Sequence, residues 1–218
     1  MMSKEFEKIF ESADLELFRL ETDPFGTNAY ILTCRQSGEN VLIDAPGNAE
    51  LIENRLKGKA VVCIVITHGH MDHIMALEEL TDKIQAPVAA HEDDAGGLPV
   101  NAKLLLKDGD VIECGKLKIN VLHTPGHTPG SLCLKVGSIL ISGDALFPGG
   151  PGKTGSPESF AMAIDSIKRK ILTLPDETVI IPGHGTSTTV GEERPAIEAF
   201  LERGYDKTLC GDVTWQSS

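Results

Sequence analysis

The chain has 218 residues, which is enough for one well-buried core or at most two small domains. Its hydrophobic content of 41% and charged content of 24% are ordinary for a globular protein. With 20 basic and 32 acidic side chains, the formal net charge is -12, and an acidic surface repels phosphate backbones. We therefore do not expect nucleic acid as a partner.

The cysteines and the N-terminal segment bear on location. Five cysteines are present, an odd number without a C-x-x-C pair, and most lie in apolar runs. This usage is typical of reduced, buried thiols in a cytoplasmic protein. The segment MMSKEFEKIFESADLELF is charged throughout and lacks the apolar region of a signal peptide. No segment approaches about 18 consecutive apolar residues, so we expect neither export nor a membrane span.

The first half of the chain reads mainly as short strands separated by turn signals. We predict strands at 15–20, 28–33, 40–44, 60–66 and 87–91, and helices at 48–56 and 74–80. The run at 60–66, AVVCIVI, is apolar throughout and predicts a strand buried on both faces. The first turn of the helix at 74–80 overlaps a cluster of histidines, and a loop rich in Asp and Gly follows the strand at 87–91.

The second half repeats this pattern. We predict a hairpin at 110–123 around Gly115, strands at 131–136, 138–142 and 178–182, and helices at 157–174 and 192–202. Strands dominate, and there is no regular alternation of strand and helix. This pattern favours sheets packed together with helices outside, in a single domain that spans residues 1–218.

Four predicted buried strands are each followed by a Gly- or Pro-rich loop that presents histidine or aspartate. These loops carry His68-Gly69-His70-Met71-Asp72-His73, His127, Asp144 and His184. Ligand sites gather where strand ends release loops. Because imidazole with carboxylate is a donor set that zinc or iron prefers, the pattern predicts a metal site.

The spacing within the first cluster indicates more than one ion. His68 and His70 are two residues apart, so in extended backbone their side chains leave on the same side and both can grip one ion. Asp72 and His73 are adjacent, so at a helix start they diverge by roughly 100°. They would not reach the same ion as the first pair. We therefore favour two ions, about 3.5–4 Å apart as in hydrolytic sites.

These residues resemble the signature of the metallo-β-lactamase superfamily, H-x-H-x-D-H, followed by a single His, Asp and His in the expected order. The resemblance spans roughly residues 28–192. It implies an α+β fold, the αββα four-layer sandwich. It further implies one metal bound by His68, His70 and His127, a second by Asp72, His73 and His184, and Asp144 as the bridging ligand.

The remaining polar candidates are less specific. Asp44 ends a strand and is either a turn residue or, by the resemblance, an acid that ties down the ligand loop. His123 is read as a structural residue or a supporter of the ligands, and His91 as a packing or solvent residue. Lys153 is in a glycine-rich loop beyond Asp144, which can carry its cation to the site as a substrate contact; the alternative is a solvated surface lysine.

The charge count suits metal-dependent hydrolysis. Two divalent ions contribute +4, whereas Asp72, Asp144 and a bridging hydroxide contribute -3, and the balance attracts a carbonyl oxygen or an anionic substrate. The expected cofactors are two zinc ions, with iron or manganese as alternatives. The expected mechanism is attack by the bridging hydroxide on a carbonyl, with Asp72 as a catalytic residue that orients it.

The resemblance extends to one branch of the superfamily. Zinc β-lactamases lack an aspartate equivalent to Asp144, and nucleases of the superfamily need extra domains and a basic surface. The runs SGDALFPGGPGKTG (142–155) and PGHGTSTTVGEER (182–194) resemble the short bacterial hydroxyacylglutathione hydrolases of the glyoxalase II-like branch. The implied activity is hydrolysis of a thioester or related activated ester, such as an S-acylglutathione, with a small molecule as the partner. Only 34 residues follow His184, enough for one helix and a tail, so we expect fewer of the C-terminal contacts that hydroxyacylglutathione hydrolases make to glutathione, and whether glutathione is the carrier stays open.

Three alternatives stay open at this point. A mononuclear iron persulfide dioxygenase would use His68, His70 and His127 alone, although GPGKTGSP stands where such enzymes often carry a C-G-R-T-D-F-like run. A lactone hydrolase would use the same fold and site. A catalytically silent metal-binding protein is disfavoured by seven intact ligands. The sequence leaves open whether the chain forms a homo-oligomer.

Overall fold

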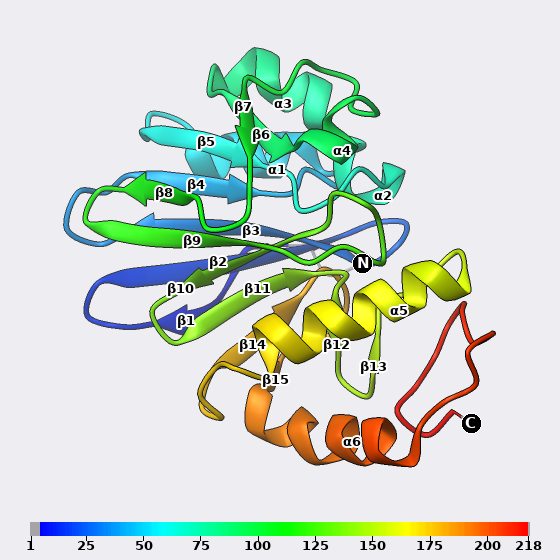
Figure 1. The fold of residues 1–218 in the computed structure, drawn as a ribbon. Helices are drawn as coiled ribbons and strands as arrows, with labels where there is room; N and C mark the ends of the chain where they lie inside the picture. Colours follow the sequence, from blue (N-terminus) through cyan, green and yellow to red (C-terminus); the bar gives the residue numbers. More distant parts are fainter. Residues whose placement is uncertain (1–4, 218) are drawn as a thin grey trace.

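Two β-sheets lie face to face, and helices cover the outer face of each sheet (Figure 1). The arrangement is that of a computed structural model, which describes residues 5–217. Residues 1–4 of the charged N-terminal segment and Ser218 lie outside the described residues. The observed fold is the αββα sandwich of the α+β class, as the sequence predicts.

The first sheet has seven strands in the order β1-β2-β3-β4-β5-β6-β7. Its strands are β1 (Glu7–Glu11), β2 (Leu15–Thr22), β3 (Thr27–Cys34), β4 (Asn40–Ile43), β5 (Val61–Val65), β6 (Val88–His91) and β7 (Leu104–Leu106). The pairs from β1 to β4 are antiparallel, and those from β4 to β7 are parallel.

The second sheet has six strands in the order β15-β14-β11-β10-β9-β8. Its strands are β8 (Val111–Cys114), β9 (Leu117–His123), β10 (Leu132–Val136), β11 (Ile139–Gly143), β14 (Val179–Pro182) and β15 (Thr188–Thr189). A separate two-stranded ribbon, β12 (Leu146–Phe147) with β13 (Gly150–Pro151), follows β11.

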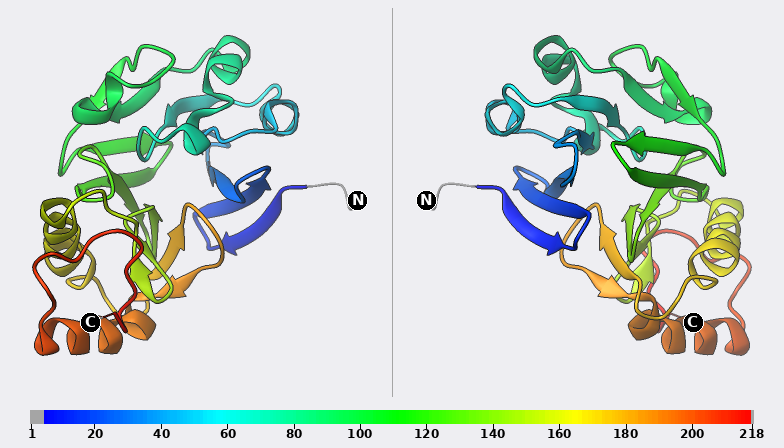
Figure 2. Two further views of the ribbon diagram at one scale, coloured as in Figure 1. Left: turned by 90° about the vertical axis from the view of Figure 1, so that its right-hand side faces the viewer. Right: turned by 90° about the vertical axis from the view of Figure 1, so that its left-hand side faces the viewer.

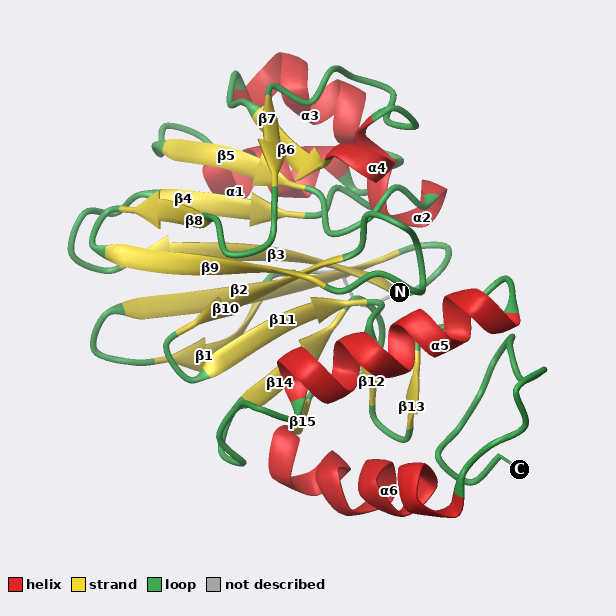
Figure 3. Ribbon diagram, in the orientation of Figure 1, coloured by secondary structure: helices red, strands yellow, loops and turns green. Residues whose placement is uncertain are grey.

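The helices separate into two groups (Figure 3). Those of the first half are α1 (Ala49–Leu56), α2 (Met71–Ile74), α3 (Leu77–Ile84) and α4 (Glu92–Ala95). Those of the second half are α5 (Pro157–Ser166), which continues as a π-helical turn over Ile167–Ile171, and α6 (Val190–Arg203). In residues 5–217 no helix combines the length and apolar character needed to cross a membrane.

Alternation along the strands explains the layers. In β3, Tyr30 and Leu32 face the second sheet, whereas Ala29 and Ile31 pack toward the first group of helices. Successive side chains of a strand point to opposite faces, so a strand in the middle of this sandwich is apolar on both. The same reasoning accounts for the apolar run in β5.

The extent predicted for the helix at 74–80 is wrong. The structure has two helices there, α2 and α3, separated by Met75 and Ala76. The carbonyl of His73 accepts a hydrogen bond from Ala45 N at 2.8 Å, and Ala76 N donates to Ala45 O at 2.8 Å. Ala45, in the loop after β4, therefore bonds to a carbonyl and an N–H that would pair within a continuous helix. As a result, α2 is a single turn, and it carries Asp72 and His73.

Smaller elements were also missed. The Asp- and Gly-rich segment after β6 begins with the short helix α4, and β1, β7, β12, β13 and β15 were not predicted. Each of these strands has two to five residues, too few for a clear apolar alternation. The other predicted strands and helices agree with the structure apart from their ends.

The two sheets approach each other at the edge where β1 and β2 lie beside β14 and β15, coloured blue and orange in Figure 2. Here Arg19 Nη1 donates to Gly185 O at 3.1 Å and the Tyr30 hydroxyl donates to Pro182 O at 2.6 Å. An isolated antiparallel bridge also joins Thr27 to His184. These contacts bring the end of β14 against the start of β3.

Candidate metal centre

The predicted ligands come from strand ends that meet on one side of the sandwich. His68 and His70 lie in the loop after β5, with Asp72 and His73 in α2 directly behind it. His127 follows β9, Asp144 follows β11 and His184 follows β14. β5 and β11 both point toward the right of Figure 1, so residues far apart in the chain converge there.

His68, His70 and His127 form the first half-site. Their nearest ring nitrogens lie within 4.8 Å of one another. Nε2 of His68 is 3.2 Å from Nε2 of His127, and the His70 and His127 rings meet edge to face with centroids 4.5 Å apart. This is the set that the resemblance assigns to one ion.

Asp72, His73 and His184 form the second half-site. Nε2 of His184 lies 3.3 Å from Nε2 of His73 and 3.1 Å from Oδ2 of Asp72. Asp72 also accepts a hydrogen bond from the Thr27 hydroxyl at 3.1 Å. The structure therefore brings these three side chains together, in the grouping that the resemblance implies.

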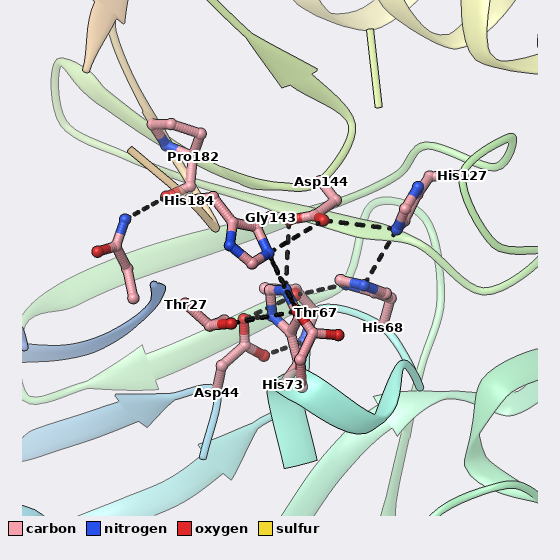
Figure 4. Close-up of polar contacts among 12 residues, drawn as sticks. Thr27, Asp44, Thr67, His68, His73, His127, Gly143, Asp144, Pro182 and His184 are labelled. Carbon is pink, nitrogen blue, oxygen red and sulfur yellow. Dashed lines mark hydrogen bonds and ion pairs between the residues drawn. The ribbon is translucent and has the colours of Figure 1, made fainter. Parts of the chain in front are cut away.

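Asp144 lies between the half-sites (Figure 4). Its Oδ2 atom is 3.5 Å from Nε2 of His127 and 3.5 Å from Nε2 of His184. Its Oδ1 atom is 3.3 Å from Nε2 of His73. One carboxylate thus faces nitrogen atoms of both half-sites, which is the position expected of a bridging ligand.

The donor set fits divalent metal ions. Tetrahedral coordination with metal–nitrogen bonds of about 2.0–2.1 Å places neighbouring ligand atoms roughly 3.3–3.4 Å apart. The nitrogen pairs of the two half-sites are 3.2 Å and 3.3 Å apart. In addition, Oδ1 of Asp144 is buried and lacks a hydrogen-bond partner among the described residues, an arrangement that is costly without a bound cation.

The ionisation of the donors suits the same role. Burial, together with the surrounding imidazoles, lowers the pKa of His68 well below its ordinary value. Burial also lowers the pKa of His127. Both rings are therefore neutral near pH 7 and offer a lone pair. Burial acts to raise the pKa of Asp144, but His73 beside it outweighs this effect and keeps the pKa low, so the carboxylate is ionised.

His73 is held by a buried carboxylate. Its Nδ1 atom donates to Oδ2 of Asp44 at 2.8 Å, and both side chains are almost completely buried. Burial acts to lower the pKa of His73, but Asp44 and Asp144 outweigh it and raise the pKa to about 10. The bond to Asp44 directs Nε2 toward the half-site, an arrangement typical of histidine ligands.

Asp44 also holds the loop before His68. Its carboxylate accepts from the backbone N–H of Thr67 and from the Thr67 hydroxyl, both at 2.8 Å. Asp44 itself has a φ of 59°, in the left-handed region that aspartate tolerates better than most residues. The residue therefore holds both ends of the ligand segment 67–73, and it is not a simple turn residue.

Gly183 allows the last ligand loop to approach. A Cβ atom at this position would lie 2.2 Å from Oδ1 of Asp144 and 2.6 Å from Cε1 of His73. No side chain fits in that space, so the glycine before His184 is required by close approach.

Lys153 contacts the site through its backbone. Its carbonyl oxygen accepts a hydrogen bond from Nδ1 of His127 at 2.7 Å. Its side chain is 68% exposed, and Nζ lies 3.8 Å from Oδ2 of Asp212. The predicted substrate contact by the side chain is neither supported nor contradicted by this geometry, whereas the role of the carbonyl was not predicted.

Two further buried carboxylates near the site were missed. Glu193 accepts from Gly149 N at 2.9 Å, from the Thr188 hydroxyl at 2.9 Å and from Trp215 Nε1 at 3.2 Å. It thereby ties the β12–β13 ribbon and the C-terminal segment to α6. The second, Asp94 in α4, lies within an acidic run that resembles a solvated surface, and no pattern in the sequence distinguishes it.

The remaining histidines stack on each other outside the two half-sites. The rings of His91 and His123 are 3.8 Å apart and inclined by 13°. Nδ1 of His91 accepts from Asp93 N at 3.2 Å, and Nε2 of His123 donates to Pro129 O at 2.8 Å. Because parallel rings do not aim their lone pairs at a common point, this pair is a packing element that supports the loop of His127.

Sequence comparison identifies the family. The model of the metallo-beta-lactamase superfamily matches residues 22–184, and the chain belongs to this superfamily. The chain is 34% identical over 211 residues to the probable metallo-hydrolase YqgX of Bacillus subtilis, covering 84% of this chain and 97% of the relative. It is 32% identical over 177 residues to the hydroxyacylglutathione hydrolase GloC of Haemophilus influenzae, covering 70% of this chain and 83% of the relative. The protein is accordingly a metal-dependent hydrolase of this superfamily.

Solved structures show the same fold. A B3 metallo-beta-lactamase, BLEG-1, matches with a TM-score of 0.73 and 31% identity, over 82% of this chain and 96% of that one. ETHE1 from Myxococcus xanthus matches with a TM-score of 0.69 and 30% identity, over 87% and 81%. TTHA1623 in a di-iron-bound form matches with a TM-score of 0.70 and 31% identity, over 81% and 96%.

Proposed function

We propose that this protein is a dinuclear metal-dependent hydrolase that cleaves a thioester or a related activated ester. The observation that carries the proposal is the position of Asp144, whose Oδ2 atom is 3.5 Å from His127 in one half-site and 3.5 Å from His184 in the other. A carboxylate shared in this way suits two ions rather than one. The similarity to the di-iron form of TTHA1623 supports a two-metal site.

The side chains of the site have distinct roles in this proposal. The bound ions supply a water of lowered pKa and an electrophile for the carbonyl oxygen. Asp72 has one oxygen 3.1 Å from His184 and hydrogen-bonded to Thr27, and it orients the attacking water toward the carbonyl. Asp44 keeps the His73 ring in one orientation, with Nε2 directed toward the half-site. A serine or cysteine nucleophile is not needed.

A thioester is favoured because the chain resembles GloC of Haemophilus influenzae, a hydroxyacylglutathione hydrolase. We propose zinc as the metal, with iron and manganese as alternatives, and a small-molecule substrate. The exposed Lys153 side chain is proposed to meet an anionic group of that substrate. All five cysteines are free thiols, which supports a cytoplasmic location.

Metal analysis combined with activity assays tests the proposal. We expect two divalent ions per chain and release of thiol from S-lactoylglutathione. The Asp144→Ala variant should lose at least one ion and most of the activity, and a variant that kept both would contradict the bridging role. A penicillin assayed in parallel addresses the similarity to the B3 enzyme BLEG-1, and preferential hydrolysis of the penicillin would overturn the thioester assignment.

A persulfide dioxygenase is the second candidate, because His68, His70 and His127 form a complete three-ligand group by themselves. The half-site of His68, His70 and His127 would then bind a single iron. Such a protein would contain one iron per chain and consume oxygen in the presence of glutathione persulfide. Oxygen uptake with this substrate, without thiol release from S-lactoylglutathione, would replace the hydrolase proposal with this one.

A further inference from the structure

We propose that Asp94 is a positioning residue that holds the two loops of the first half-site at the separation metal binding requires. This inference rests on the metal site of the proposed function. Asp94 lies in α4, outside the family signature, and its side chain is not among the candidate ligands. The residue is 8% exposed, and its carboxylate is directed into the protein.

One carboxylate bonds to both loops. Oδ2 of Asp94 accepts from Gly69 N at 2.9 Å, and Gly69 lies between His68 and His70. The same oxygen accepts from the Thr128 hydroxyl at 2.6 Å, and Oδ1 accepts from Gly130 N at 2.9 Å. Thr128 directly follows His127 and Gly69 lies between His68 and His70, so the three bonds hold the chain beside all three histidines of the half-site.

The fit around Asp94 is close. A Cβ atom at Gly130 would lie 2.7 Å from the Asp94 carboxyl carbon, so the loop can reach the carboxylate only because this residue is glycine. The Ser131 hydroxyl accepts from Thr128 N at 3.0 Å and lies 2.8 Å from the Thr128 hydroxyl. The loop after His127 is therefore held by several bonds that converge on one acid.

A second link reaches the same loop from the start of α4. His91, whose ring caps this helix, stacks on His123, and His123 donates to Pro129 O. No contact described for this link reaches the loop of His68. The link positions α4 beside the loop of His127, whereas the bonds from Asp94 also set the distance to the loop of His68.

The distance at stake is the 3.2 Å between Nε2 of His68 and Nε2 of His127, which belong to different loops. Loss of a partner that orients metal ligands typically costs about 10–100-fold in metal affinity. Among the described residues, the hydrogen bonds of the Asp94 carboxylate all go to the loops of the first half-site, so its removal should weaken one ion much more than the other. A residue that merely stabilised the fold would weaken both ions together.

Zinc titrations of the full chain against a chromophoric chelator test the inference. We expect Asp94→Ala to weaken one of the two ions about 10–100-fold and to leave the other within about threefold. His127→Ala and His184→Ala serve as references for loss of the first and the second half-site. In the cobalt-loaded protein, the absorption bands lost in Asp94→Ala should be those lost in His127→Ala.

Glu92→Gln is the matched control, because Glu92 is an acid of the same helix with an exposed side chain and the substitution removes the same charge. It should bind both ions like the wild type. Asp94→Asn keeps one oxygen and should bind the affected ion more tightly than Asp94→Ala, and it serves if the alanine variant does not fold. Thermal unfolding of the metal-free variants shows separately how much fold stability is lost.

The outcomes separate this inference from the function on which it rests. A wild type with two ions and an Asp94→Ala variant with unchanged or equally weakened sites would overturn the positioning role alone. A wild type that binds one ion at the first half-site would overturn the dinuclear function, and Asp94→Ala should still weaken that ion. A wild type that binds no metal would overturn both.

Discussion

The carbonyl oxygen of Lys153 accepts a hydrogen bond from Nδ1 of His127 at 2.7 Å, so the orientation of this ring depends on the loop after β13. The loop is in turn held by the C-terminal segment, since Thr154 and Gly211 exchange two backbone hydrogen bonds of 3.2 Å and 2.9 Å. A segment far from the signature thereby supports one of the ligands. The predictions below follow from this and similar supporting contacts.

Truncation of the Lys153 side chain should affect the substrate but not the metal. The carbonyl that bonds to His127 is retained in Lys153→Ala, so metal content should be unchanged and the free energy of unfolding should change by less than about 0.5 kcal/mol. If the side chain meets an anionic group, KM should rise severalfold at low salt with kcat retained, and the difference should shrink at high salt. Lys103→Ala, at an exposed lysine elsewhere, is the control. An unchanged KM would show that Lys153 is a solvated surface residue.

Replacement of Asp44 should disrupt the ligand segment after β5, because its carboxylate bonds to Thr67 and to His73. Asp44→Asn removes the negative charge that accepts the hydrogen bond from Nδ1 of the buried His73. Loss of one member of a buried ion pair costs about 3–5 kcal/mol of the free energy of unfolding. Asparagine tolerates the φ of 59°, so backbone strain would not explain the effect. Urea unfolding of the metal-free protein measures the loss, with Asp82→Asn at an exposed site as control. A loss below about 1 kcal/mol would contradict the supporting role.

Gly183 should tolerate no side chain. In Gly183→Ala the added Cβ would lie 2.2 Å from Oδ1 of Asp144, so His184 or Asp144 must move. We expect metal content after dialysis to fall below one ion per chain. Gly155→Ala, where no other atom lies within 4 Å of the added Cβ, should retain the wild-type content. Full metal content in Gly183→Ala would show that the backbone adjusts without harm to the site.

Glu193 should hold the C-terminal segment against α6. Its removal in Glu193→Ala leaves Gly149 N, the Thr188 hydroxyl and Trp215 Nε1 without their common acceptor, at a cost of about 2–4 kcal/mol. Trp215 is the single tryptophan of the chain and is 3% exposed, so its fluorescence reports on this segment. We expect a red shift of emission in Glu193→Ala and none in Glu202→Ala, at an exposed position of the same helix. Unshifted emission would mean that other contacts hold the segment.

The cysteines should differ in reactivity and make the fold sensitive to alkali. Cys210 is exposed, so one thiol per native chain should react with a colorimetric thiol reagent at pH 8, and none in Cys210→Ser.

Burial raises the pKa of Cys63 and of Cys133 to about 12. A raised folded-state pKa stabilises the fold fully below the unfolded value of about 9, and the contribution is lost as the pH rises toward 12. Denaturant titrations should therefore show a falling free energy of unfolding above pH 9, and a flat profile would contradict the burial of these thiols.

Much of the architecture and the candidate site was accessible from local sequence patterns. The apolar run of β5 predicted a strand because burial on both faces leaves no polar position, and the turn signals between short apolar runs predicted β2, β3 and β4. His68, His70, Asp72 and His73 predicted two half-sites because their spacing along the chain sets the directions of their side chains.

Other features depended on contacts between distant segments. The break between α2 and α3 arises because Ala45 takes the carbonyl of His73, and nothing within residues 71–84 indicates it. Asp94 and Glu193 lie in acidic runs that resemble solvated surface, yet both are buried acceptors for loops far away in the chain. Periodicity and spacing report on neighbours along the chain, so they were sufficient for the longer strands and for the division of the first histidine cluster, whereas the αββα sandwich and the grouping of the seven candidate ligands were implied by the resemblance to the superfamily. Which polar groups orient those ligands was decided only by packing, because a hydrogen bond across 25 or more residues, such as that from Gly69 to Asp94, leaves no pattern in the local sequence.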